Sequence, residues 1–277
     1  MTAGGRAACV IGWPIAHSRS PLIHNYWLKH YGIAGDYRSE AVPPEDFRDF
    51  VRSLAGHGYV GANVTVPHKE TALACSEPDD RARAVGAANT LWLDGVLRAT
   101  NTDVEGFLDN LDACVPGWQR NQRKAVVLGA GGAARAVVYG LQQRGVDHIT
   151  VINRSETRAA ELRQRFSIAG APWSERDAAL ADAGLLVNTT TLGMAGQPPL
   201  AVDVDRLPAD AAVADLVYVP LDTPLLRAAR ARKLATADGL GMLLHQAVRG
   251  FALWFGVKPE VTAELRALVE ADLAKPS

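Results

Sequence analysis

The sequence predicts a two-lobed α/β protein, and two observations support this prediction. The chain has 277 residues, of which 48% are apolar, so it can fill the cores of two ordinary domains. Short apolar runs alternate with helix-length segments, which is typical of parallel strands buried between layers of helices. The predicted strands are Cys9–Ile11, Gly61–Val66, Ala125–Leu128, His148–Ile152, Gly184–Asn188 and Val213–Val217.

Two breaks in this alternation predict the domain boundaries. A fresh strand-helix unit with a glycine-rich turn begins near residue 122, so we place one boundary near Asp103–Val104 and the other near Gly239. Met242–Phe255 is apolar around most of its circumference, and such a helix must be buried. We expect it to pack back on the first lobe. The predicted domains are therefore 1–103 with 240–277, and 104–239, with a cleft between them.

Composition excludes several classes of function. Lys and Arg number 29 against 30 Asp and Glu, so nothing predicts a nucleic-acid or membrane-surface partner. The three cysteines include no Cys-x-x-Cys pair, and the seven histidines lack metal-ligand spacing, which predicts free thiols, a reducing compartment and no bound metal. The first residues do not resemble a signal peptide, and no run approaches 18 apolar residues. We expect a cytoplasmic protein.

A glycine-rich turn predicts a dinucleotide site. The turn follows an apolar strand and precedes a helix predicted over Arg135–Arg144, which is the context that makes the Gly-x-Gly-x-x-Ala pattern meaningful. Gly129 permits the tight turn, Gly131 lets backbone N–H groups approach a pyrophosphate, and Ala134 allows close contact of helix and strand. The second domain is thus predicted to be Rossmann-like. The turn contains Gly129, Ala130, Gly131, Gly132 and Ala133 before Ala134.

The residues after the next strand predict a preference for NADP. An NAD-binding domain usually places Asp or Glu there to accept a hydrogen bond from the ribose 2′-hydroxyl. This chain instead has Arg154 and Arg158, one helical turn apart, at the start of a helix that Ser155 can cap. Two guanidinium groups suit a dianionic 2′-phosphate. The whole segment is Asn153, Arg154, Ser155, Glu156, Thr157 and Arg158.

Two serines near the N-terminus suggest an anion site. Pro21 at the first helical position, with Ser20 before it, is ordinary capping chemistry, but this leaves Ser18 unexplained. Two hydroxyl groups beside a positive helix end also make a carboxylate site. Both interpretations can hold together.

Lys69 occupies an unfavourable position for a cation. A strand is predicted to stop near Pro67 and a helix to begin at Lys69, where the helix dipole disfavours positive charge by about 0.3–1 kcal/mol. The simpler alternative for Lys69 is a solvated side chain. Asp103 also has a simpler alternative, helix capping, because Asn101 to Asp103 form a typical N-cap. Gln246, in an apolar helix, needs a ligand hydroxyl or backbone partner. We expect His68 to be a structural group or a support for the site residues, and not a base.

Eight motifs in order resemble the shikimate dehydrogenase family over nearly the whole chain. Together they are far more specific than any one of them. They are Ser18-x-Ser20-Pro21, Asn63-x-Thr65-x-Pro67-x-Lys69, Gly86-x-x-Asn89-Thr90, Asn101-Thr102-Asp103, the turn at Gly129, Asn153-Arg154-Ser155, Asn188 to Met194, and Gly239-x-x-Met242 with Gln246.

The resemblance implies a fold, a reaction and a set of roles. The implied activity is that of an oxidoreductase of the shikimate pathway, in aromatic amino-acid biosynthesis, which interconverts 3-dehydroshikimate and shikimate with NADP. Lys69 and Asp103 resemble the catalytic pair. Ser18, Ser20 and Tyr218 resemble contacts of the substrate carboxylate, and Asn63, Thr65, Asn89, Asp103 and Gln246 contacts of the ring hydroxyls. The positions near the cofactor are Asp80, Leu216, Gly239 and Met242.

Two other functions stay open at this point. A relative that acts on quinate needs only modest extra room for one hydroxyl group. A regulatory module that binds NADP without catalysis would keep the fold, but it would not need the proton donor that Lys69 and Asp103 provide. A homodimer is one open oligomeric state.

Overall fold

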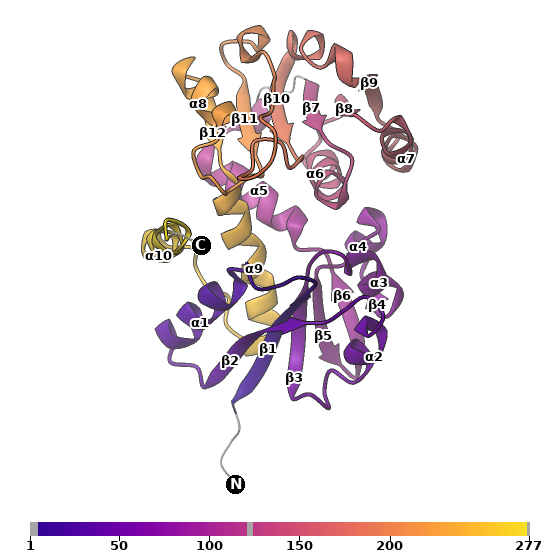
Figure 1. Cartoon of the computed structure of the whole chain (residues 1–277), viewed down its shortest axis with the longest axis vertical. Coiled ribbons are helices and arrows are strands. Elements are labelled where there is room, and N and C mark those ends of the chain that lie inside the picture. The colour runs from indigo at the N-terminus through magenta and orange to yellow at the C-terminus, as the bar shows by residue number, and fades with distance from the viewer. Residues whose placement is uncertain (1–4, 121–123, 276–277) are drawn as a thin grey trace. The chain divides into compact units, whose positions relative to one another are not determined.

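The computed structural model describes residues 5–120 and 124–275, which form two compact units. Unit 1 contains the residues up to Thr102 and those from Gln246 onward, and unit 2 runs from Asp103 to His245. Each unit is built around one six-stranded sheet (Figure 1). The predicted α/β class is confirmed.

The sheet of unit 1 is mixed and has the order β2-β1-β3-β5-β6-β4. Strands β2, β1 and β3 pair in parallel, whereas β5 is antiparallel to both β3 and β6. Parallel strands were predicted for β1 and β3, but β2 was not predicted as a strand. The β5–β6 hairpin was not predicted, although Asp94-Gly95 is a typical hairpin turn and Gly95 has φ of 70°. The strands are β1 (Arg6–Gly12), β2 (Gly35–Ala41), β3 (Tyr59–Val64), β4 (Glu77–Pro78), β5 (Thr90–Asp94) and β6 (Val96–Thr100).

Helices cover both faces of this sheet. One face packs against α2 (Phe47–Arg52), α3 (Lys69–Ala74) and α4 (Asp80–Val85). The other face carries α1 (Ser20–His30) and the end of α9 (Gly239–Phe255), and α10 (Ala263–Leu273) contacts α1. The first of these cores includes Cys9, Ile11, Phe47, Val51, Ala62, Ala72 and Ala82.

Helix α9 ends within unit 1, where its aromatic side chains are buried. Trp254 is 1% exposed, and its indole Nε1 donates a hydrogen bond of 2.8 Å to the carbonyl of Leu91 in β5. Gly61 in β3 makes room for this indole, because a Cβ there would collide with Trp254 Nε1. The aromatic side chains that made this segment apolar on all sides thus fill the core of the first unit.

The sheet of unit 2 is parallel throughout and has the order β12-β11-β10-β7-β8-β9. When β7 to β12 are numbered 1 to 6 along the chain, their order in the sheet, starting from β9, is 3-2-1-4-5-6. This is the doubly wound order. Its switch point lies between β7 and β10. The strands are β7 (Lys124–Leu128), β8 (Ile149–Asn153), β9 (Ala169–Pro172), β10 (Ala183–Asn188), β11 (Ala212–Asp215) and β12 (Ala235–Ala237).

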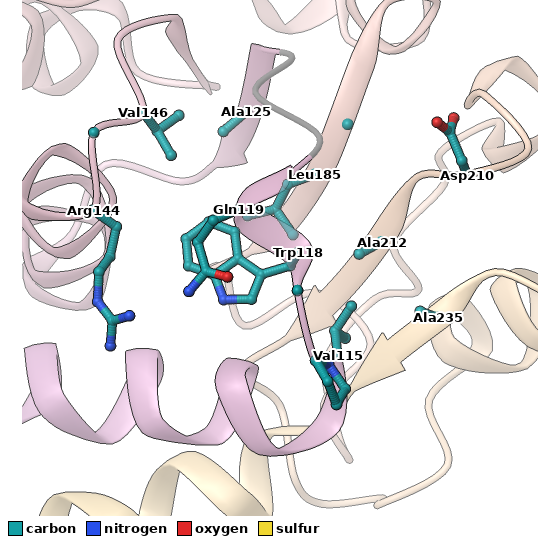
Figure 2. Close-up of a pocket in the computed structure, with 14 residues that line it drawn as sticks. Val115, Trp118, Gln119, Ala125, Arg144, Val146, Leu185, Asp210, Ala212 and Ala235 are labelled. Carbon is teal, nitrogen blue, oxygen red and sulfur yellow. The ribbon is translucent and has the colours of Figure 1, made fainter.

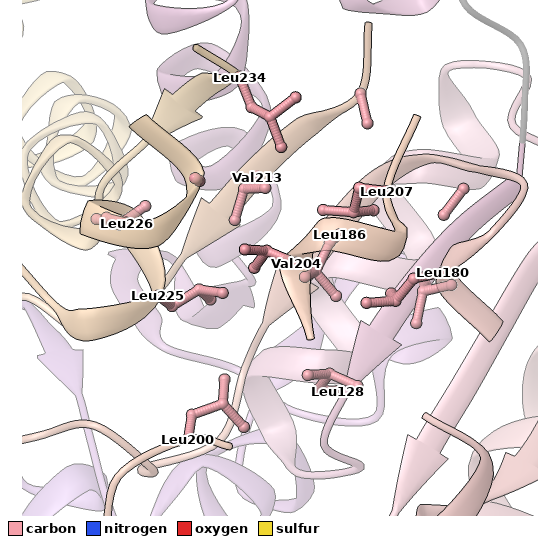
Figure 3. Packing of buried hydrophobic residues seen from close by; sticks show 14 of the residues in the cluster. Leu128, Leu180, Leu186, Leu200, Val204, Leu207, Val213, Leu225, Leu226 and Leu234 are labelled. Atoms are coloured by element: carbon pink, nitrogen blue, oxygen red, sulfur yellow. The ribbon is translucent and has the colours of Figure 1, made fainter. Parts of the chain in front are cut away.

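The helices of unit 2 are α5 (Asp103–Cys114), α6 (Gly132–Gln143), α7 (Glu156–Phe166), α8 (Pro224–Ala231) and the start of α9. Gly140 of α6 lies against Leu108 of α5, where a Cβ would come within 3.3 Å of the leucine. A core cluster joins β7, β10 and β11 to α8, with Leu186, Val213 and Leu225 among its members (Figure 3). Short 3₁₀ turns complete the unit at η1 (Trp118–Arg120), η2 (Trp173–Glu175), η3 (Ala178–Leu180) and η4 (Val204–Arg206).

Three details of the predicted elements were wrong. Strand β3 stops at Val64 instead of Val66, although the Thr65 N–H still donates to the Ile11 carbonyl at 2.9 Å. Strand β11 stops at Asp215 instead of Val217, because the Asp215 carboxylate accepts the Val217 N–H. Strand β10 is followed by turns and one 3₁₀ turn rather than by a helix.

Candidate active site

Lys69 is the first residue of α3, as predicted, and the residue before it is held rigidly. His68 is 2% exposed, lies 4.4 Å from Phe47 in a stacked arrangement, and donates from Nε2 to the Val42 carbonyl at 2.8 Å. Burial lowers the pKa of His68, so the neutral imidazole is favoured. The expected structural role of His68 is confirmed, and it fixes the backbone from which Lys69 projects.

Two buried amides beside Lys69 are oriented by a shared hydrogen-bond network. Asn63 Nδ2 donates to the Asn89 carbonyl at 3.3 Å and to Thr90 Oγ1 at 3.2 Å, while its Oδ1 accepts from the Tyr37 hydroxyl at 2.6 Å. Asn89 Oδ1 accepts from the Thr102 N–H at 2.7 Å. Because each amide has a settled orientation, each presents a defined donor or acceptor pattern.

The serine motif differs from its predicted capping role. Ser20 is already the first residue of α1, the preceding Arg19 takes the N-cap position, and neither residue makes a side-chain cap. Instead, Ser18 Oγ accepts the Ser20 N–H at 3.3 Å. Pro21 lies in the first turn as predicted. The Ser20 side chain forms a hydrogen bond with Tyr37 instead.

Sheet topology brings most of the predicted unit 1 residues to one edge. The carboxyl ends of parallel β1 and β3 and the start of antiparallel β5 meet at the same edge of the sheet. Ser18 and Ser20 follow β1, Thr65 and Lys69 follow β3, and Asn89 directly precedes β5. Gln246, 9% exposed, lies in α9, and exposed Asp80 begins α4. The two serines, the two asparagines, Thr65 and Lys69 therefore lie at the same edge of the sheet, because the carboxyl ends of parallel strands meet there.

The glycine turn of unit 2 has the shape that a pyrophosphate needs. Gly129 has φ of 109°, and a Cβ there would collide with Thr189 Oγ1, which follows β10 across the switch point. Gly131 is the N-cap of α6, where first-turn N–H groups point outward. At Gly131 and Gly132 an added Cβ would meet nothing within 4 Å. This open space before a helix N-terminus fits the phosphates of a dinucleotide.

The predicted 2′-phosphate residues lie around the start of α7. Asn153 Nδ2 donates to the Ser155 carbonyl at 2.9 Å and so shapes the turn. Ser155 is the N-cap residue but its side chain makes no capping bond, contrary to prediction. Arg154, Thr157 and Arg158 are exposed. Arg158 also lines a cavity of 460 Å³ with Ala130 and Arg135; the sequence prediction did not single out Arg135.

Several of the remaining predicted residues of unit 2 lie at or near the start of α9. Asp238 caps this helix, with its Oδ1 accepting the Gly241 N–H at 3.1 Å. Gly239 packs on the backbone of Leu216, where a Cβ would collide with the Leu216 carbonyl. The other predicted residues are half-buried Tyr218 and Met242, and Asp103, which begins α5 and is 8% exposed. Lys69 and Asp103 belong to different units.

Sequence reasoning missed several polar residues that support the site. Tyr37, Thr90 and Thr102 orient Asn63 and Asn89, and Asp215 holds the turn that carries Leu216. A signal was available for Asp215, because it is the one acidic residue within the apolar run Val213–Val217. Thr90 and Thr102 lie within the family motifs quoted above but were given no role there, and nothing in the sequence around Tyr37 indicates a bond to Asn63.

Another cavity in unit 2 lies at the opposite, amino ends of the strands (Figure 2). It has a volume of 410 Å³ and is lined by Trp118, Gln119 and Arg144 among others. All three donate to the Asp112 carboxylate, at 2.6 to 2.8 Å. The polar groups of this cavity are therefore engaged by the protein itself, and we assign it no ligand.

Within residues 5–120 and 124–275, no helix is long and apolar enough to cross a membrane. The same described residues contain no group of three or more His, Cys, Asp or Glu side chains that could hold a metal ion.

A doubly wound sheet with an open glycine turn at its switch point, attached to a second unit rich in oriented polar groups, defines the class of dinucleotide-dependent enzymes. Three family models match the chain. The shikimate dehydrogenase substrate binding domain matches residues 10–91, the shikimate / quinate 5-dehydrogenase model residues 115–193, and the shikimate 5′-dehydrogenase C-terminal domain residues 239–268.

Relatives extend these matches to full length. A protein of Rhodopseudomonas palustris strain TIE-1 named shikimate dehydrogenase (NADP(+)) is 68% identical over 277 residues, covering 99% of both chains. The chain therefore belongs to the shikimate dehydrogenase family.

Solved structures agree with this assignment. The Thermus thermophilus shikimate 5-dehydrogenase in complex with NADP(H) and shikimate has a TM-score of 0.84 and 34% identity, covering 97% of this chain and 98% of that one. A Corynebacterium glutamicum quinate dehydrogenase in complex with NAD has a TM-score of 0.90 and 31% identity, covering 96% and 99%.

Proposed function

We propose that the protein catalyses the reversible NADPH-dependent reduction of 3-dehydroshikimate to shikimate, a step of the shikimate pathway in aromatic amino-acid biosynthesis. The observation that carries this proposal is the full-length identity of 68% to a relative of that name. The array of oriented polar groups beside Lys69 supports it. Residues 1–103 and 240–277 form the substrate-binding and catalytic domain, and residues 104–239 bind NADP.

The polar edge of unit 1 suits a hydroxylated ring acid. Ser18 and Ser20 lie at the N-terminus of α1, where hydroxyl and backbone donors favour a carboxylate. Asn63 and Asn89, whose amides are held by the network described above, recognise ring hydroxyls in fixed directions. Thr65, Asp103 and Gln246 add further hydroxyl contacts, and Tyr218 adds a contact to the carboxylate.

Lys69 and Asp103 perform the acid-base chemistry in this proposal. NADPH supplies a hydride when bound. As negative charge develops on the ketone oxygen, the Lys69 ammonium donates a proton to it, and in the oxidative direction the neutral amine takes that proton back. Asp103 supports the ammonium electrostatically. Asp103 follows directly after Thr102, whose N–H is bound to Asn89, so its backbone starts from the ordered network of unit 1.

The cofactor site combines the glycine turn with two arginines around the start of α7. The backbone from Gly129 to Ala133 holds the pyrophosphate at the open N-terminus of α6. Arg154 and Arg158 bind the 2′-phosphate, which selects NADP over NAD. The other proposed cofactor contacts are Asn153, Ser155, Thr157, Leu216, Gly239, Met242 and Asp80.

A spectrophotometric assay tests this proposal. Purified protein is mixed with shikimate or quinate and with NADP⁺ or NAD⁺, and formation of the reduced nicotinamide is followed at about 340 nm. We expect the highest kcat/KM with shikimate and NADP⁺. A clear preference for quinate would instead assign the activity suggested by the C. glutamicum relative. Cofactor binding without turnover would indicate a regulatory module.

Two further features remain predictions. We propose a cytoplasmic location, because all three cysteines are free thiols, which suits a reducing compartment. A homodimer is a prediction that light scattering coupled to gel filtration can test at several protein concentrations.

A further inference from the structure

Asp215 is a buried carboxylate at the end of β11 that receives three hydrogen bonds. It is 1% exposed. Its Oδ1 accepts from Asn188 Nδ2 at 2.8 Å and from the Val217 N–H at 3.1 Å, and its Oδ2 accepts from Thr223 Oγ1 at 2.7 Å. All three partners are neutral donors.

Burying a carboxylate without a cationic partner costs desolvation free energy. Among the described residues, no Lys, Arg or His forms a salt bridge with Asp215. Burial raises the pKa of Asp215, and the bonds from Thr223, Val217 and Asn188 oppose this shift. An apolar residue of similar size would avoid the desolvation cost altogether.

The three donors come from different segments at the carboxyl edge of the sheet. Asn188 ends β10, and its own Oδ1 accepts from the N–H and the hydroxyl of Thr190 at 3.0 and 2.7 Å, which shapes the following loop. Thr223 is the N-cap of α8 and accepts the Leu226 N–H at 3.2 Å. One carboxylate thus joins the ends of β10 and β11 to the start of α8.

The turn held in this way carries two residues of the proposed active site. Leu216 and Tyr218 directly follow Asp215, and the Leu216 N–H donates to the Asn188 carbonyl at 3.0 Å. Gly239, another proposed cofactor contact, packs on the Leu216 carbonyl so closely that a Cβ would collide with it. A displaced turn would therefore shift both proposed ligand contacts and the entry to α9.

We propose that Asp215 is a positioning residue, which holds the turn Leu216–Tyr218 in place for the cofactor and for the carboxylate of the substrate. This inference rests on the proposed function, because the roles of Leu216 and Tyr218 come from it. Asp215 acts through its three acceptor contacts and touches neither ligand itself.

Two substitutions at Asp215 separate the acceptor role from the charge. In Asp215→Asn the amide oxygen can keep the bonds from Asn188 and Val217, while the amide nitrogen donates to Thr223 Oγ1. In Asp215→Leu all three donors lose their acceptor. We expect KM for NADP⁺ and shikimate to rise about 10-fold or more in Asp215→Leu, with a smaller fall in kcat, and to change by less than about 3-fold in Asp215→Asn.

Thr223 offers a second, milder pair of variants. Thr223→Val removes one donor to the carboxylate, and Thr223→Ser keeps the hydroxyl. We expect KM for NADP⁺ to rise in Thr223→Val and to stay within about 2-fold of the unaltered protein in Thr223→Ser. This pair keeps the inference testable if Asp215→Leu does not fold.

Val213→Ala is the control for a general loss of stability. Val213 is fully buried, lies two residues earlier on the same strand, and belongs to the core cluster of Figure 3. We expect it to lower the melting temperature without changing either KM, when activity is measured well below the lowest melting midpoint. Calorimetric titration with NADP⁺ provides a readout of affinity that does not depend on turnover.

The outcomes distinguish the inference from the proposed function. If the unaltered protein does not oxidise shikimate with NADP⁺, the proposed function fails, and calorimetry still tests Asp215. If the unaltered protein is active but Asp215→Leu affects KM and NADP⁺ affinity no more than Val213→Ala does, the positioning role is wrong. Equal damage in Asp215→Asn and Asp215→Leu would also overturn it, because the negative charge rather than the acceptors would then matter.

Discussion

His24 should make the stability of the protein strongly dependent on pH. Its ring is completely buried in unit 1 and stacks on Tyr37 at a centroid distance of 4.1 Å, with Trp254 and Phe251 nearby. Burial lowers the pKa of His24 to about 3, and the neighbouring Asn63 side chain offsets part of this effect. The folded protein therefore holds a neutral imidazole that an unfolded chain would protonate.

The sign and size follow from the two pKa values of His24. Between the unfolded value of about 6.5 and the folded value of about 3, the unfolded chain binds one more proton, so stability rises with pH over this window. The contribution is complete above about pH 6.5 and is lost as the pH falls. Relative to pH 7, His24 alone should cost about 2 kcal/mol of unfolding free energy at pH 5 and about 3 kcal/mol at pH 4.

The variant His24→Phe keeps a stacking ring and removes the titration. Urea unfolding at pH 7, 6, 5 and 4, followed by tryptophan fluorescence and by circular dichroism, gives the slope for each protein. We expect the slope of His24→Phe to be shallower by about 1.4 kcal/mol per pH unit between pH 4 and 6. Val51→Ala, which removes apolar volume from the core of the same unit, should lower stability at every pH and keep the steep slope. Equal slopes in His24→Phe and the unaltered protein would refute the reasoning.

Three further predictions concern the proposed site. Lys69→Ala should lower kcat by about 10²–10⁴-fold with little change in the affinity for shikimate, and undiminished turnover would contradict the acid-base role. Arg154→Asp should reduce or invert the preference for NADP⁺ over NAD⁺, measured as a ratio of kcat/KM, whereas Arg206→Asp, on the exposed 3₁₀ turn η4 and outside the cavity lined by Arg158, should leave that ratio unchanged. Gly131→Ala should stay within about 0.5 kcal/mol of the unaltered stability, because its Cβ meets open space, yet raise KM for NADP⁺; an unchanged KM would show that the pyrophosphate lies elsewhere.

The dinucleotide-binding turn could be predicted because its constraints are local. Gly129 has φ of 109°, and an added Cβ at Gly131 would meet open space. Both requirements concern the local backbone, and glycine satisfies them at fixed positions after an apolar strand. The start of α3 at Lys69 could also be predicted from a local signal, because Pro67 interrupts the chain between the preceding strand and the helix. Local signals failed for Ser20 and Ser155, because both occupy helix starts but neither side chain caps the helix.

Partners of buried polar groups could not be predicted in this way. Tyr37 in β2 reaches Asn63 in β3, although β1 lies between these strands and 26 residues separate the two in sequence. Asn188 reaches Asp215 across 27 residues because β10 and β11 are neighbouring strands. Which strands are neighbours, and in what register, depends on packing of whole layers and not on any local sequence. By itself, the sequence determined the α/β class, the glycine turn and the family. Only the tertiary structure decided which hydrogen bonds orient Asn63 and hold Asp215, since a buried donor must take whatever acceptor the fold brings within reach.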